Sequence, residues 1–209
     1  MQSKISRYFN VLGNLPLTTL VNDINGNKLE LSEAFKDLTT RIRETHNKGN
    51  KLMFIGNGGS AGICSHMAID YSKNGGIRSL AFNDGAALTC LSNDLGYENV
   101  FAKQVELHAV KGDMLIAISS SGKSVNILNA VDVANEKGCF VLTLSGFNTD
   151  NPLRKFGDIN FYVDSAEYGF VELTHIALCH AILDIEMGWG TKEVSPEEIK
   201  LGLNKNIAA

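Results

Sequence analysis

Short apolar runs alternate with longer amphipathic stretches between residues 51 and 187. The runs are continuously apolar rather than alternating, which is typical of strands buried on both faces. They predict five strands, at Leu52–Ile55, Ser79–Phe82, Met114–Ile118, Phe140–Leu144 and Ile159–Val163. Helical spacing predicts helices near residues 60–74, 85–92, 98–109, 124–137 and 169–187. The alternation predicts an α/β fold with a mostly parallel five-stranded sheet and helices on both of its faces.

The residues before the first predicted strand have a helical pattern. One helix is expected at about residues 3–25, interrupted near Pro16, and a second at 30–48 with an apolar stripe from Leu31 to Ile42. A helical pair in front of an α/β core often packs against another subunit, so these helices predict a homo-oligomer.

At 209 residues the chain has the length of one domain. We expect a single domain over residues 1–209, made of the helical pair at 1–49, the α/β core at 50–187 and a polar C-terminal tail at 188–209. Within the tail, Ser195 and Pro196 are typical of a helix start.

Charge and composition exclude several classes of partner. The net charge of -4 provides no basic field, so nucleic acid is not expected as a ligand. The N-terminal residues are polar and charged, and no segment reads as a membrane span, so the sequence predicts a cytoplasmic protein with no membrane partner. The four cysteines have no paired spacing, which predicts reduced thiols.

A hydroxyl-rich turn, residues 119–124, follows the third predicted strand, and we call it the serine loop. A helix is predicted to begin directly after it, and the amides of a helix's first turn carry the positive end of its dipole. With the hydroxyl donors of the loop, these amides form a site suited to a phosphate group. The alternative is that a serine only caps the helix, but a cap needs one hydroxyl and the loop has four, on Ser119, Ser120, Ser121 and Ser124.

The first predicted strand ends in a second candidate loop, residues 56–61 with the sequence Gly-Asn-Gly-Gly-Ser-Ala, which we call the glycine loop. It fits the dinucleotide pattern G-x-G-x-x-A, but Asp84, the nearest candidate for the acidic residue of that fingerprint, lies in a turn beyond the second strand. The serine loop resembles the end of a nucleotide P-loop, but Ala117 replaces the first glycine of that motif. No nucleotide cofactor is therefore expected.

The two loops are instead predicted to bind one small ligand. Glycines allow the backbone to approach such a ligand closely, and Asn57 offers an amide to its hydroxyl groups. Because ligands of parallel sheets bind beyond the carboxyl ends of the strands, both loops can open onto one crevice.

Two helices carry a possible metal site. His66 and Asp70 are four residues apart and share a helix face, while Glu172 and His180 are eight apart and offset by about 80°. If the helices meet, the four side chains would suit zinc or another divalent cation. The alternative for either histidine alone is a partly buried, hydrogen-bonded side chain.

Taken in order, these motifs resemble the sugar isomerase (SIS) domain family, and within it the phosphoheptose isomerases, which convert sedoheptulose 7-phosphate to D-glycero-D-manno-heptose 7-phosphate. The resemblance covers residues 30–187 and is carried by the glycine loop, His66, Asn93-Asp94, the serine loop and the segment from Glu172 to His180. Taken alone, Asn93-Asp94 fits a turn as well as a sugar contact.

The resemblance implies a role for each motif. The phosphate is expected on Ser119, Ser120, Ser121 and Ser124, and the sugar on Asn57, Gly58, Gly59, Ser60, Asn93, Asp94 and Glu172. One zinc ion per subunit is expected on His66, Asp70, Glu172 and His180, with the base and acid on Asp70 and His180. It also implies a homotetramer with active sites between subunits, and a product used for lipopolysaccharide or capsule heptose.

The chain departs from the family pattern at three positions. Asp70 stands where the heptose isomerases have a glutamate base, Glu172 where they have a glutamine, and Lys123 where an asparagine is usual. A base shortened by one methylene can be misplaced by about 1 Å, enough to cost on the order of 100-fold in rate. The sequence therefore leaves the base open between Asp70 and Glu172.

The expected reaction is aldose–ketose isomerisation of a phosphosugar through an enediol. A carboxylate would move the proton between neighbouring carbons, and His180 would move the proton between the oxygens. The competing hypothesis is a non-catalytic SIS protein that binds a phosphosugar as a signal or scaffolds a partner protein; a third is an isomerase of another phosphosugar. Ionisable groups at all four metal and catalytic positions favour an enzyme.

Overall fold

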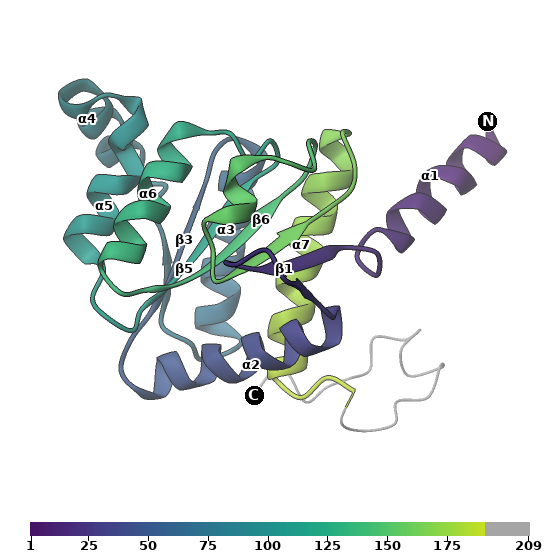
Figure 1. Ribbon diagram of the computed structural model, residues 1–209, viewed down its shortest axis with the longest axis horizontal. Helices are drawn as coiled ribbons and strands as arrows, with labels where there is room; N and C mark the ends of the chain where they lie inside the picture. Colours follow the sequence, from purple (N-terminus) through teal and green to yellow (C-terminus); the bar gives the residue numbers. More distant parts are fainter. Residues whose placement is uncertain (191–209) are drawn as a thin grey trace.

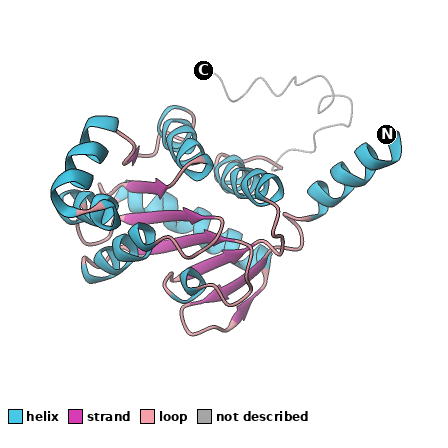
Figure 2. Cartoon of the chain, turned by 90° about the horizontal axis from the view of Figure 1, so that it is seen from above, coloured by secondary structure: helices cyan, strands magenta, loops and turns pink. Residues whose placement is uncertain are grey.

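The computed structural model describes residues 1–190 as a seven-stranded sheet with helices on both faces (Figures 1 and 2). The predicted helix start at Ser195 and the tail from residue 191 onward lie outside the described residues. All five predicted strands are present and mutually parallel, which confirms that part of the prediction: β3 (Leu52–Gly56), β4 (Ser79–Ala81), β5 (Met114–Ser119), β6 (Phe140–Ser145) and β7 (Ile159–Tyr162).

Two further strands make the sheet mixed, so the prediction of five strands was incomplete. β1 (Leu20–Asp23) pairs antiparallel with β7, and β2 (Lys28–Leu29) pairs antiparallel with β1. The predicted first helix ends early, because α1 covers only Gln2–Asn14. Leu15 still has helical dihedral angles (φ -57°, ψ -42°), but Pro16 has no backbone N–H with which to continue the helix. The edge of β7 pairs with the chain that follows.

The strands of the sheet supply a hydrophobic core on each face. Leu52 and Phe54 point to one face and Met53 and Ile55 to the other, as the two-residue period of a strand requires. The first face is covered by α2 (Leu31–Asn47), α3 (Gly59–Lys73) and α7 (Tyr168–Glu186). The second is covered by α5 (Val100–His108) and α6 (Val125–Glu136), with α4 (Gly85–Leu95) and the short helices η1 (Tyr97–Asn99) and η2 (Pro152–Lys155) beside them.

The helix α7 is long and apolar enough, by length and composition alone, to cross a membrane. In the fold, however, it packs against both α2 and α3 and buries Val171, Leu178 and Ile182 in the core. Its C-terminal end is fixed by an ion pair in which Nη2 of Arg43 lies 2.8 Å from Oε2 of Glu186. The apolar character of α7 is therefore that of a core helix.

The order of the strands, β2-β1-β7-β6-β5-β3-β4, places β3 beside β5. From β3 the chain runs through α3 outward to β4, whereas from β5 it runs through α6 in the opposite direction to β6. Such a switch point leaves a crevice between the carboxyl ends of two neighbouring strands. The glycine loop follows β3 and the serine loop follows β5, so both open onto this crevice.

The first helix, α1, projects away from the body of the molecule (Figure 1). None of its residues is buried, although Ile5, Tyr8, Phe9 and Val11 are large and apolar. The ring of Tyr8 lies 4.6 Å from that of Phe170 in α7, but a single copy of the chain leaves most of the apolar face of this helix exposed.

Candidate active site

The glycine loop turns sharply from β3 into α3. Gly58 is the residue before the helix and has φ +54°, and Gly59 begins it. A Cβ atom at Gly59 would lie within 2.4–2.6 Å of all three carboxyl-group atoms of Glu172. Glycine at this position therefore lets the start of α3 lie directly against the Glu172 carboxylate of α7.

The serine loop turns from β5 into α6. Ser124 precedes α6 but makes no capping hydrogen bond through its side chain; its hydroxyl lies 3.3 Å from that of Ser119. Ser121 accepts a hydrogen bond from the Lys123 amide at 3.3 Å. The hydroxyl of Ser124 is thus not used as the helix cap that would be its simplest structural role, and it remains near the first turn of α6, where an anion is stabilised.

The segment after β6 supports the serine loop through backbone hydrogen bonds. The amide of Gly146 donates to the Ser120 carbonyl at 3.0 Å, and that of Leu153 donates to the Gly122 carbonyl at 3.2 Å. Asn151 is fully buried between them, and its Nδ2 lies within hydrogen-bonding distance of Ser145 Oγ and of two backbone carbonyls. The loop therefore rests on a rigid support.

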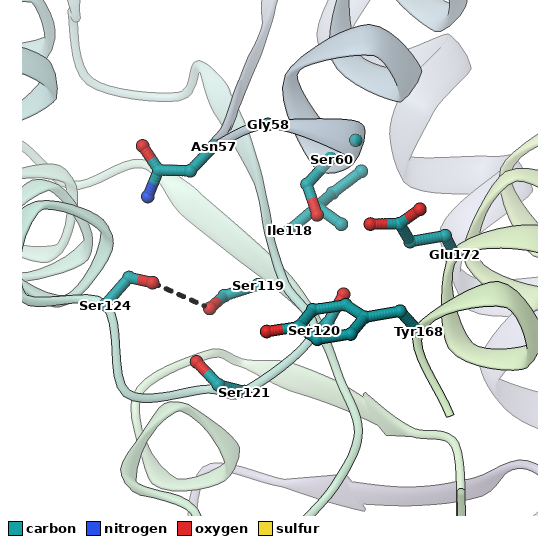
Figure 3. A pocket seen from close by; sticks show the side chains of 11 residues that line it. Asn57, Gly58, Ser60, Ile118, Ser119, Ser120, Ser121, Ser124, Tyr168 and Glu172 are labelled. Atoms are coloured by element: carbon teal, nitrogen blue, oxygen red, sulfur yellow. Dashed lines mark hydrogen bonds between the residues drawn. The ribbon is translucent and has the colours of Figure 1, made fainter. Parts of the chain in front are cut away.

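Together the two loops and the start of α7 enclose a cavity of about 250 Å³ (Figure 3). The cavity is lined by Asn57, Gly58, Gly59, Ser60, Ile118, Ser119, Ser120, Ser121, Ser124, Tyr168 and Glu172. No lysine or arginine is among these lining residues, and Lys123 is exposed outside them. An anion held here would depend on hydroxyl and amide donors.

The amide of Asn57 is engaged within the protein. It exchanges two hydrogen bonds of 2.9 Å with the amide of Asn126 in α6, and Tyr97 donates its hydroxyl to Asn57 Oδ1 at 2.9 Å. In this arrangement the side chain predicted to contact sugar hydroxyls ties the glycine loop to α6.

Three of the four predicted metal ligands lie together, where α3 and α7 meet. One ligand atom from each of His66, Asp70 and His180 lies within 4.8 Å of the other two. Asp70 Oδ2 is 3.4 Å from Nε2 of His66 and 3.8 Å from Nδ1 of His180. Two imidazoles and one carboxylate form a donor set that suits zinc and leaves room for a further ligand, so the residues present fit such an ion.

Glu172 lies apart from these three side chains. It precedes His180 by eight residues, about 12 Å along the axis of α7, and lines the cavity beside Gly59. The structure thus separates the two carboxylates between which the sequence could not choose: Asp70 lies between the histidines, and Glu172 faces the serine loop.

Asn93 and Asp94, the other predicted sugar contacts, do not line the cavity of this chain. They end α4 at exposed positions, and Asn93 Nδ2 donates to Asp94 Oδ1 at 2.9 Å. Within one copy of the chain, the structure does not bring them to the serine loop.

Sequence reasoning missed three residues of this region, namely Tyr168, Asn126 and Tyr97. A signal existed for Tyr168, which precedes Glu172 by four residues and so shares its helix face. Asn126 precedes Ala130 and Ala134 by four and eight residues and so lies on the apolar face of α6, where a polar side chain needs a buried hydrogen-bond partner. Tyr97 lies in η1, and nothing in its local sequence pointed to Asn57.

His175 and the buried cysteines near the sheet are neutral. Burial lowers the pKa of His175 to about 4, so its ring, bonded through Nε2 to the Ser145 carbonyl at 3.1 Å, is uncharged at neutral pH. Burial raises the pKa of Cys179 to about 12 and that of Cys64 well above its usual value. All four cysteines are free thiols, as predicted, and three are buried.

Comparison with known proteins agrees with this geometry. The family model described as SIS domain matches residues 25–146. The phosphoheptose isomerase of Aliarcobacter butzleri is 39% identical over 148 residues, which cover 68% of this chain and 78% of that protein.

Solved structures show the same relationship. The phosphoheptose isomerase GmhA from Neisseria gonorrhoeae superposes with a TM-score of 0.75 at 27% identity, over 89% of this chain and 98% of that one. A phosphoheptose isomerase from Francisella tularensis gives a TM-score of 0.76 at 26% identity, over 89% and 97%. The chain belongs to the SIS domain family and, within it, is similar to the phosphoheptose isomerases.

Proposed function

We propose that the chain is a phosphosugar aldose–ketose isomerase that converts sedoheptulose 7-phosphate to D-glycero-D-manno-heptose 7-phosphate. The observation that carries this proposal is the cavity in which a serine loop at a helix N-terminus faces the Glu172 carboxylate. Its relatives named phosphoheptose isomerase support the choice of substrate.

The serine loop binds the phosphate in this proposal, and phosphate binding positions the sugar chain for reaction. Binding energy from a group remote from the reacting carbons is thereby used for orientation. Glycine-loop residues Asn57 to Ser60 line the sugar side of the cavity.

Glu172 is proposed as the base, because it is the carboxylate that lines the cavity. It removes the proton from the carbon beside the carbonyl and returns it to the neighbouring carbon, with an enediol between the two steps. His180 is proposed to move the proton between the two oxygens. Its Nδ1 faces Asp70, and its Nε2 has no hydrogen-bond partner among residues 1–190.

His66, Asp70 and His180 would hold a divalent cation, which we propose is zinc, one per subunit. When bound, such an ion polarises a carbonyl oxygen and stabilises negative charge that develops on it. We also propose that the protein is cytoplasmic and that its product supplies the heptose of lipopolysaccharide or capsule.

The assembly is proposed to be a homotetramer in which α1 packs against neighbouring subunits. The exposed apolar residues of α1 support this, as does an apolar groove between α2 and α7 that is lined by Leu31, Phe35, Ala177, Leu178 and Ala181.

Light scattering of the purified chain is expected to give four times the monomer mass, and Phe9→Glu should lower that value. A monomeric wild-type protein would contradict the assembly.

The function is tested by NMR with sedoheptulose 7-phosphate in deuterated water. We expect the aldose heptose 7-phosphate to appear with deuterium at the carbon beside the carbonyl, because an enediol exchanges its proton with solvent. Chelation should slow the reaction, and added zinc should restore it. Absence of both product and exchange, while the sugar phosphate still binds, would contradict the proposed function.

A further inference from the structure

Tyr168 lines the cavity but has no role in the reaction proposed above. It begins α7, lines the cavity with the serine loop, and has 63% of its surface exposed. Figure 3 shows its side chain reaching from α7 toward the serine loop, with Glu172 farther along the same helix. Its hydroxyl forms no hydrogen bond with any residue between 1 and 190.

The ring of Tyr168 is held by Phe147. The two ring centroids are 4.8 Å apart with planes at 81°, an edge-to-face contact that stabilises aromatic pairs. Phe147 has φ +61° and is the one non-glycine residue in the described part of the chain with a positive φ. This conformation costs about 1–2 kcal/mol for a side chain with a Cβ atom, and such strain is common at functional sites.

The strained residue is fixed on both sides. Its amide donates to the Ser165 carbonyl at 2.9 Å, and its carbonyl accepts from the Tyr162 hydroxyl at 2.9 Å. The preceding residue, Gly146, bonds to Ser120 in the serine loop. One rigid dipeptide thus sets the position of both the serine loop and the Tyr168 ring.

The charge of the cavity makes an extra donor valuable. Its lining residues include the Glu172 carboxylate but no lysine or arginine. A phosphate bound there needs neutral donors to offset its charge, and a hydrogen bond to a charged group contributes more than one between neutral groups.

We propose that Tyr168 contacts the substrate, donating its hydroxyl to the phosphate held by the serine loop while its ring forms the outer wall of the cavity. This inference rests on the proposed function and adds a phosphate ligand to it. Phe147 acts through Tyr168 and is a positioning residue.

The test compares Tyr168→Phe with Tyr168→Ala, with calorimetry of inorganic phosphate binding as the first measurement. The phenylalanine variant removes only the hydroxyl and should raise the Kd for phosphate about tenfold. With sedoheptulose 7-phosphate, KM should rise similarly and kcat should stay within about threefold. The alanine variant also removes the ring and should raise KM further.

Phe147→Gly tests the positioning role. Glycine adopts a positive φ without strain, so this variant adds no backbone strain that would lower the unfolding temperature. KM should rise, because the Tyr168 ring loses the aromatic ring that supports it. A wild-type KM in this variant would remove Phe147 from the proposal.

Two results separate this inference from the proposed function. Unchanged phosphate affinity in Tyr168→Phe would overturn the role of Tyr168, even if the wild-type protein isomerises its substrate normally. Weakened phosphate binding in Tyr168→Phe, with no isomerisation by the wild-type protein, would support Tyr168 and contradict the proposed function.

Discussion

Replacing Glu172 with glutamine is expected to lower deuterium exchange at the carbon beside the carbonyl about 1,000-fold, the scale typical of a general base. Glutamine keeps the shape of the side chain but cannot accept the proton. The residues proposed to hold the phosphate, those of the serine loop and Tyr168, are unchanged in this variant, so KM for the sugar phosphate should change little. NMR measures the rates of exchange and of product formation in the wild-type protein and in Glu172→Gln at equal concentration.

Glu167→Gln is the matched control. It removes the same charge from the residue preceding α7, at an exposed position outside the lining of the cavity, and should leave exchange unchanged. Asp70→Asn addresses the other carboxylate and is expected to lower the metal content. If Asp70→Asn keeps its metal and loses exchange while Glu172→Gln retains it, then Asp70 is the base and our assignment is wrong.

Gly122→Ala is expected to raise the Kd for inorganic phosphate about 100-fold, the loss that corresponds to about two hydrogen bonds to a charged group. Gly122 has φ +62°, and a Cβ atom there would lie 1.9 Å from Oδ1 of Asn151. Asn151 is fully buried and bonded at three acceptors, so the serine loop must move instead. The hydroxyls of Ser120 and Ser121 would then miss the phosphate.

Two further variants keep this prediction testable if the loop change also lowers stability. Gly62→Ala lies in α3, where a Cβ atom meets nothing within 4 Å, and should bind phosphate normally. Asn151→Ala in the Gly122→Ala background removes the two closest contacts, with Oδ1 at 1.9 Å and Cγ at 2.3 Å, and leaves only the Cβ atom at 2.9 Å, so it should recover part of the affinity. Wild-type phosphate affinity in a folded Gly122→Ala protein would show that the serine loop is not the phosphate site.

The α/β core could be predicted because its local patterns and its tertiary structure agree. Continuous apolar runs such as Leu52–Ile55 are buried on both faces, and the helices between them carry apolar stripes. β1 could not be predicted in the same way. Leu20 and Val21 fit a helix or a strand equally, and the choice depends on pairing with β7, about 140 residues later in the chain.

The two loops of the candidate site could be predicted because each has a recognisable local sequence. Four hydroxyls before a helix and four small residues after a strand needed no knowledge of the rest of the fold. The separate positions of Asp70 and Glu172 could not be predicted without the fold, because the packing of α3 on α7 determines which carboxylate lies between the histidines. The hydrogen bonds between Asn57 and Asn126 likewise depend on how the loop after β3 lies against the first turn of α6.

The pairing of β1 with β7 bears on how the chain folds during synthesis. Val21 leaves the ribosome long before Phe161, the residue with which it pairs, has been translated. Contacts that join such distant parts of a chain form late and slowly. The parallel strands β3 to β6 can assemble first, while the N-terminal segment stays open until β7 provides an edge to join. In a polysome, α1 would then be available to neighbouring chains before its own sheet is complete.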